Sequence, residues 1–181
     1  MAKIRHLLLP VAAGLLAFQC AAADLRPGGL FVQLGQGDHS MQAASAGLVW
    51  PWAWQRAVGS GQVGGYTEAY VARWRAKEPG GRVNFNHIGL VPMFRFRPDA
   101  GRSPWFVEAG IGLTYMDRIF STQEKQFSTH FNFADVVGAG RSFGEGNRHE
   151  LSLRLTHFSN AGIKHPNPGE NIVRLRYAYL F

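Results

Sequence analysis

Hydrophobic residues recur at every second position in most segments after residue 25, with small or polar residues between them. In the clearest segment, Leu151, Leu153 and Leu155 alternate with polar residues. A period of two is the signature of a β-strand with two different faces. The alternating segments are residues 30–35, 48–54, 70–75, 87–96, 107–115, 127–133, 151–156 and 173–181. Turns rich in glycine and proline separate them, so the pattern predicts eight antiparallel strands in one domain, residues 24–181.

Composition decides which eight-stranded architecture these segments favour. The chain is 46% hydrophobic and 13% aromatic, but only 17% charged. Soluble domains average about 25% charged residues, so this chain is short of the charges that cover a solvated surface. Aromatic residues also gather toward the ends of the apolar faces, as in the girdles of membrane barrels. We therefore predict an all-β fold, an eight-stranded antiparallel transmembrane β-barrel of the outer membrane. A secreted sandwich or lipocalin-like barrel is the alternative.

Both ends of the chain support export to the outer membrane. Basic Lys3 and Arg5 precede an apolar run over residues 7–18, and three alanines at 21–23 form a cleavage pattern. This run is too short for an ordinary membrane anchor, so we predict a cleaved signal peptide over residues 1–23. Its removal takes away Cys20, the only cysteine. At the other end the chain finishes on Phe181, behind alternating tyrosines, which resembles the terminal-strand signal of bacterial outer-membrane barrels.

Charged residues occur on the more polar faces of the predicted strands. Residues 24–181 carry 17 Lys and Arg against 12 Asp and Glu, a net charge of about +5 that suits an anionic membrane surface. Export argues against nucleic acid as the partner of this basic chain. Inside a small barrel, charges need partners. We expect the polar interior to include Arg154, Arg174, Arg176, Glu108 and Asp135.

The alternation carries two polar residues onto the apolar face near the end of the seventh segment. After Leu155, the next members of the same row are His157 and Ser159. Residues two apart on a strand project to one face about 7 Å apart at their Cα atoms. A histidine beside a serine supplies a general base for a weak hydroxyl nucleophile. An interfacial polar pair solvated by lipid head groups would have the same spacing.

The residues around this pair resemble a known enzyme family. The string His157-Phe158-Ser159-Asn160-Ala161-Gly162, followed by Lys164, Pro166, Asn167, Gly169 and Glu170, is similar to that of the outer-membrane lipid A 3-O-deacylases, known as PagL. This resemblance covers about the last 25 residues. It implies a serine esterase with a His-Ser-Glu triad facing the outer leaflet. By resemblance, Ser159 is the nucleophile, His157 the base and Glu170 the acid, while Asn160 and Gly162 help to stabilise the oxyanion.

The acid of this triad has an alternative on the same strand. Alternation back from Phe181 directs odd-numbered residues outward, so Glu170 would point inward unless the junction after Gly169 re-aims it. Asn171 is then the outward-facing substitute that would orient His157.

The function predicted from the sequence is hydrolysis of the acyl chain ester-linked at position 3 of lipid A. The partners are lipid A or lipopolysaccharide in the outer leaflet and the surrounding membrane lipid, and a homodimer is left open. A serine mechanism requires no metal or other cofactor, because amide donors can hold the oxyanion. Two alternatives remain, a non-catalytic adhesive or structural barrel and a lipid A acyltransferase.

Overall fold

The computed structural model describes residues 26–181, and alternation in the sequence becomes strand structure along most of this length. The predicted signal peptide, residues 1–23, lies outside the described residues. The strands are β1 (Gly29–Gly37), β2 (Gln42–Pro51), β3 (Arg56–Val58), β4 (Gly61–Glu78), β5 (Gly81–Arg97), β6 (Trp105–Met116), β7 (Phe131–Phe143), β8 (His149–Ser159) and β9 (Glu170–Leu180). Three 3₁₀ turns, each three residues long, join some of them. Among residues 26–181 no helix is long and apolar enough to cross a membrane.

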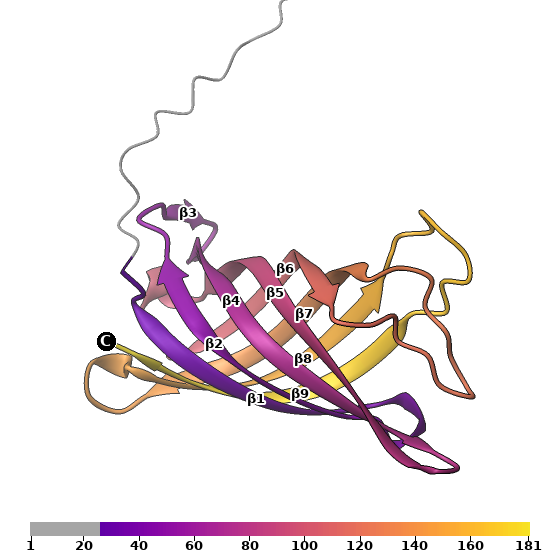
Figure 1. Ribbon diagram of the computed structural model, residues 1–181. Helices are drawn as coiled ribbons and strands as arrows, with labels where there is room; N and C mark the ends of the chain where they lie inside the picture. The colour runs from indigo at the N-terminus through magenta and orange to yellow at the C-terminus, as the bar shows by residue number, and fades with distance from the viewer. Residues whose placement is uncertain (1–25) are drawn as a thin grey trace, which may run out of the picture.

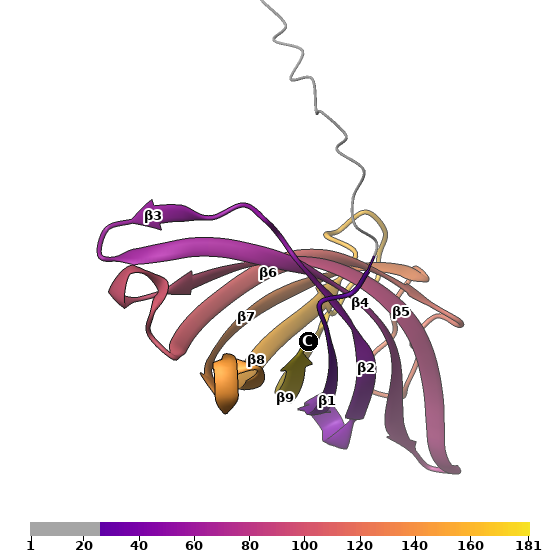
Figure 2. The same ribbon diagram turned by 90° about the vertical axis from the view of Figure 1, so that its left-hand side faces the viewer.

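Eight of these strands close into an antiparallel barrel. Each strand pairs with its neighbours in chain order, β2 pairs with β4, and β1 pairs with β9 to complete the circle. The three-residue β3 extends the edge of β4 beside the barrel (Figure 2). Closure leaves no unpaired barrel edge, which is the condition for placing β-structure in lipid. The predicted eight-stranded barrel is confirmed.

The outer wall is apolar over most of its height. The leucines of β8 at 151, 153 and 155 are 45%, 59% and 47% exposed, and the outward residues of β1, β5, β6 and β9 are similarly apolar. Such an exposed apolar wall suits lipid and would be unfavourable in water.

Two predicted segments differ from the structure. Tyr70, Ala72 and Trp74, which alternation assigns to an apolar outer row, are buried inside the barrel, and the outward residues of that part of β4 include Arg73 and Arg75. Phe127, assigned to a strand, lies before β7 and is buried in the β6–β7 connection. In both places the barrel interior is itself apolar, so hydrophobicity alone did not identify the outward face.

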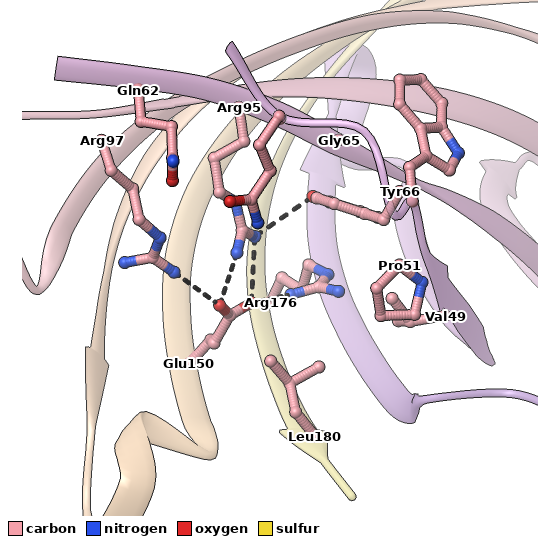
Figure 3. Close-up of a pocket in the computed structure, with 13 residues that line it drawn as sticks. Val49, Pro51, Gln62, Gly65, Tyr66, Arg95, Arg97, Glu150, Arg176 and Leu180 are labelled. Carbon is pink, nitrogen blue, oxygen red and sulfur yellow. Dashed lines mark hydrogen bonds and ion pairs between the residues drawn. The ribbon is translucent and has the colours of Figure 1, made fainter. Parts of the chain in front are cut away.

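Ion pairs fill the half of the interior nearer the C-terminus. Figure 3 shows Arg95 and Arg97 converging on Glu150, with Arg95 also donating to the hydroxyl oxygen of Tyr66. The ion-paired residues of this interior network are Arg95, Arg97, Arg154 and Arg176 with Glu68, Glu108 and Glu150. Arg174 is buried as well, with its guanidinium over the Phe158 ring at 5.0 Å. The predicted polar interior is therefore confirmed for these arginines and Glu108.

The other half of the interior is filled by apolar side chains. Trp74 lies at its centre, with ring centroids 4.8 Å from Phe158 and 5.4 Å from Phe120. We refer to this cluster as the apolar plug; its members are Met41, Ala43, Trp74, Ala76, Phe85, Met116, Phe120, Phe127, Ala134, Phe158 and Ile172. A barrel of eight strands is narrow enough for side chains to fill it, as this cluster does.

The two ends of the barrel carry different connections (Figure 1). The C-terminus and the β7–β8 turn lie at one end. The β8–β9 connection, the long β6–β7 connection and the β4–β5 hairpin lie at the other, above the apolar plug. The end of β8 that carries His157 and Ser159 is therefore far from the C-terminus.

Candidate active site

Three polar residues lie side by side across three neighbouring strands of the outer wall. In the strand register, Asp135 of β7 is directly opposite His157 of β8, and His157 is directly opposite Asn171 of β9. Their chain neighbours, such as Phe158 and Ile172, are buried in the interior, so the three side chains belong to the outward face. We call Asp135, His157 and Asn171 the outer polar row.

A hydrogen bond fixes the imidazole within this row. The Nδ1 atom of His157 lies 2.8 Å from Oδ1 of Asn171. Because an amide oxygen only accepts, Nδ1 carries the proton in this contact and donates it. The other ring nitrogen, Nε2, then has a free lone pair and can act as a base.

Gly169 leaves room for the imidazole at the start of β9. A Cβ atom added to Gly169 would lie 2.5 Å from Cε1 of His157, which is closer than real Cβ contacts come. The φ angle of Gly169 is +68°, in the left-handed region that favours glycine. Glycine therefore suits this position in both space and backbone conformation, and a larger residue would displace the imidazole.

Ser159 follows His157 on the same face and ends β8. Its Oγ atom accepts a long hydrogen bond of 3.5 Å from the backbone N–H of Ala161. Within the described residues, no hydrogen bond joins Ser159 to His157. In proteins without substrate such catalytic contacts are often long, and they tighten when the substrate binds.

A tight turn directly after Ser159 presents the Ala161 amide. Ala161 and Gly162 both have left-handed φ angles, +53° and +76°, and the N–H of Ile163 closes the turn onto the Asn160 carbonyl. The buried Asn160 side chain holds this turn from inside, because its Oδ1 accepts from the Gly162 N–H at 3.0 Å. Its Nδ2 donates to Ser128 Oγ and to the Lys164 carbonyl.

Glu170 does not join the outer polar row. It is 1% exposed and points into the barrel, as strict alternation along β9 requires. Its carboxylate accepts hydrogen bonds from the Asp38 N–H at 2.8 Å and from Nζ of Lys125 at 2.9 Å. The expected contact of Glu170 with His157 is thus replaced by the contact of Asn171 with His157, since no bulge reverses the two faces.

Lys125 links Glu170 to the neighbouring connections. Its ammonium group also donates to the Gly169 carbonyl at 3.1 Å and pairs with Asp38. Partial burial lowers the pKa of Lys125, but the hydrogen bonds to Asp38 and Glu170 outweigh this and raise the pKa above its ordinary value. The cluster therefore ties Gly169, the residue packed against His157, to two other loops.

Comparison with known proteins decides the family. The sequence model described as "Lipid A 3-O-deacylase (PagL)" matches residues 42–180. The lipid A deacylase PagL of Bordetella bronchiseptica is 35% identical over 170 residues, which span 92% of each chain. The chain belongs to the lipid A 3-O-deacylase (PagL) family. The PagL protein of Pseudomonas aeruginosa is 28% identical, over 94% of this chain and 96% of that protein.

Solved structures agree with membership of the PagL family. The crystal structure of the outer membrane enzyme PagL superposes with a TM-score of 0.73 and 27% identity, over 84% of this chain and 99% of the other. Neisserial surface protein A shares the fold alone, with a TM-score of 0.51 and 12% identity over 84% of this chain and 95% of that one. These findings confirm the predicted family, the outer-membrane location and the function, a lipid A 3-O-deacylase.

Within this PagL-family barrel, one polar residue lies where sequence analysis did not place it. Asp135 was expected in the interior network, but it is half-buried on the outer wall, between the inward residues Ala134 and Val136. The predicted segment over 127–133 ends before it, and its apolar row, Phe131 and Phe133, was not continued to the next position. Counting back from Val137, which is 55% exposed, would have directed Asp135 outward.

Proposed function

We propose that this PagL-family protein hydrolyses the 3-O-linked acyl ester of lipid A with Ser159 as nucleophile, His157 as general base and Asn171 as the residue that orients the imidazole. The observation that carries this proposal is the hydrogen bond from His157 Nδ1 to Asn171 Oδ1 on the lipid-facing wall. It leaves Nε2 as the basic nitrogen on the strand face that also carries Ser159. Asn171 takes the place that the resemblance gave to Glu170.

The chemistry follows from this protonation state. Ser159 Oγ attacks the ester carbonyl carbon while Nε2 of His157 takes the hydroxyl proton. The imidazolium then returns that proton to the sugar oxygen as the carbon–oxygen bond of the ester breaks. Water attacks the resulting acyl-serine by the same route, releasing the fatty acid and restoring the free serine.

The backbone N–H of Ala161 is the oxyanion donor that we assign. It already points to Ser159 Oγ, and a carbonyl bound there would receive the same donor as negative charge develops on its oxygen. Asn160 and Gly162 support this donor by shaping the turn, because their own groups bond to each other and to neighbouring loops.

The position of the site suits a substrate that stays in the membrane. Beside His157 the outer wall has a shallow, mostly apolar recess that extends from Ala109 and Gly110 of β6 across β7 to Leu155 of β8. An acyl chain can lie against this wall without entering water. The ester therefore reaches Ser159 by lateral movement within one leaflet.

Replacement of the nucleophile tests the proposal. Ser159→Ala should reduce deacylation by about 10⁴-fold or more, because it removes the attacking oxygen and leaves only binding and the oxyanion donor. Mass spectrometry of lipid A from cells that make the variant measures the loss of one acyl chain. Ser152→Ala is the matched control, because Ser152 lies on the same strand but faces the interior.

Each other outcome would redirect the assignment. Equal deacylation by the parent and by Ser159→Ala would remove Ser159 from the chemistry. A gain of mass would indicate acyl transfer instead of hydrolysis, and unchanged lipid A with an inserted parent barrel would favour a non-catalytic barrel.

Chemical labelling tests the orientation that this function needs. Ile163 is 71% exposed in the β8–β9 connection, whereas Glu145 is exposed at the opposite end of the barrel. Cys20 is the only cysteine and lies in the predicted signal peptide, so a new thiol has no competitor in the processed chain. On intact cells, a membrane-impermeant reagent should label Ile163→Cys but not Glu145→Cys. The reverse result would place the site away from the outer leaflet.

A further inference from the structure

Cations gather on one side of the outer wall, toward the end of the barrel that carries the β8–β9 connection. Arg73, Arg75 and Lys77 follow one another along the outward face of β4, and Arg82 lies near the start of β5 on the same face. We call these four residues the cationic patch. Among the eight barrel strands of the described structure, the one other outward Lys or Arg is Arg141, near the opposite end. Positive charge on this wall is therefore concentrated in one place.

The cationic patch has no negative partner of its own. Within residues 26–181 none of its members forms an ion pair. The strand register places the neutral residues Ala44 and Asn86 on either side of Arg73, and it places Lys77 directly opposite Arg82. Like charges directly opposite on neighbouring strands repel, because their Cβ atoms lie only about 5 Å apart. The arrangement is unfavourable by itself and becomes favourable when an anion lies between the cations.

A chain of hydrogen bonds holds the guanidinium of Arg73 in place. Nε of Arg73 donates to Oδ1 of Asn86 at 2.8 Å. Asn86 in turn donates from its backbone N–H and from Nδ2 to the two carboxylate oxygens of Asp117, at 3.0 and 2.7 Å. The two terminal nitrogens of Arg73 have no hydrogen-bond partner among the described residues. A fixed guanidinium with free donors is suited to bind a phosphate through two parallel hydrogen bonds.

Next to Arg73, toward the middle of the barrel, the outer wall is hollowed and apolar. A shallow recess of about 780 Å³ extends from Leu34 of β1 across β2 and β4 to Ile88 of β5, and Arg73 borders it. The small side chains of Ala44 and Ala46 line this recess. A second recess of about 710 Å³ shares Ala46 and Ile88 with the first and continues it along the wall. The cationic patch therefore lies at the head of a continuous apolar surface, which matches a lipid with a phosphorylated head and acyl chains.

We propose that the cationic patch and this recess form a second lipid-binding site, in which the phosphate groups of a lipid A molecule bind the patch and its acyl chains lie in the recess. β4 is four strands from β8 in either direction around the barrel, so this site lies opposite the active site. On β2, β4 and β5 of the described structure no serine or histidine faces outward, so the lipid is bound there and not cleaved. A second copy of the chain docked symmetrically on this face would bring the same positive charges together. The inference uses the substrate of the family but not the proposed roles of Ser159 and His157.

The test measures lipid binding to the complete barrel by native mass spectrometry from detergent micelles. The probe is lipid A that already lacks its 3-O-linked acyl chain, so that the deacylation reaction cannot consume it. The double variant Arg73→Gln/Arg75→Gln removes two charges and keeps polar side chains. At the same lipid concentration we expect the parent to retain one lipid more than the double variant. The affinity for that lipid should fall about tenfold or more, because hydrogen bonds between charged groups are lost.

Resistance to urea gives a second readout, which a merely structural role of these arginines would not produce. Without lipid, the double variant should be as stable as the parent or more stable, because repulsion within the cationic patch is relieved. With the phosphorylated lipid, the parent should gain more stability than the variant, because a ligand stabilises the folded state that binds it. Arg75→Gln alone changes a side chain without a hydrogen bond in the described residues, and it should lower lipid binding by an intermediate amount.

Arg141→Gln is the matched control, because Arg141 also faces outward but lies near the opposite end of the barrel, over the Trp105 ring at 5.6 Å. It should retain the lipid as the parent does, and an equal loss in this control would overturn the inference. So would equal binding of the same lipid without its phosphates, or equal stabilisation by inorganic phosphate alone. An unchanged lipid count with a changed oligomeric state would assign the face to a second copy instead. Failure of the proposed function is a separate result, since Ser159→Ala would then deacylate lipid A as the parent does.

Discussion

Polar side chains occupy two regions of this barrel that differ in how fully they are bonded. In the interior network every glutamate forms an ion pair with at least one arginine. The Glu108 carboxylate by itself accepts three hydrogen bonds, from Arg95, Arg154 and Tyr66. In the outer polar row, the hydrogen bond between His157 and Asn171 is the one contact among the three side chains in the described structure.

This difference separates stability from chemistry. Buried charges that are fully paired rigidify a structure, and the loss of one partner is expensive because the other charge is left buried. The outer groups keep unused bonding capacity: the Nε2 lone pair of His157 and the carboxylate of Asp135. Unused capacity on a lipid-facing wall is what a reaction with a membrane ester requires.

The largest effect, a loss of folding stability, should come from removing one charge of the interior network. Glu108→Gln removes the charge that pairs with Arg95 and Arg154 and increases the excess of positive charge in the network, which already has four arginines and three glutamates. We expect the free energy of unfolding to fall by about 3–5 kcal/mol, measured by urea titration in micelles. The deacylation rate per folded molecule should change little.

An exposed glutamate provides the comparison for this variant. Glu124→Gln affects a side chain that is 61% exposed and should change stability by less than about 0.5 kcal/mol. Equal stability of the two variants would contradict the distinction between the regions.

An intermediate effect should come from the residue that orients the histidine. Asn171→Ala removes the acceptor of His157 Nδ1 and should lower kcat about 10²-fold, since the imidazole loses both orientation and tautomer. Glu170→Ala should lower it less, because Glu170 acts only through Lys125 and the neighbouring loops. The rates of the purified variants on lipid A compare the two, and a larger loss in Glu170→Ala would return the orienting role to the glutamate.

The smallest effect should come from crowding the imidazole. Gly169→Ala places a methyl group against His157 and strains a left-handed backbone, which costs about 1–2 kcal/mol. We expect kcat to fall about tenfold with only a modest loss of stability. Gly146→Ala, also left-handed but at the opposite end of the barrel, is the control for strain alone and should leave kcat unchanged.

The strands and the family were predictable from the sequence because their signals are local. Alternation indicated the outward faces of β1, β5, β6, β8 and β9, and the string after His157 indicated the family. The apolar plug was not predictable in this way, since Trp74 and Phe127 are as hydrophobic as the lipid-facing residues. Parity along β9 suggested Asn171 beside His157, but only the structure shows that no bulge interrupts it. The position of Asp135 directly opposite His157 depends on the register between β7 and β8. Alternation within one strand indicates only which face a residue lies on.

The apolar plug also bears on the permeability of the membrane that holds this enzyme. Trp74, Phe120 and Phe158 close the barrel with tightly packed rings beneath the loops. Ions and small hydrophilic solutes have no wetted route past such a plug. We therefore expect the barrel to add no conductance for ions or small hydrophilic solutes to the membrane that holds it.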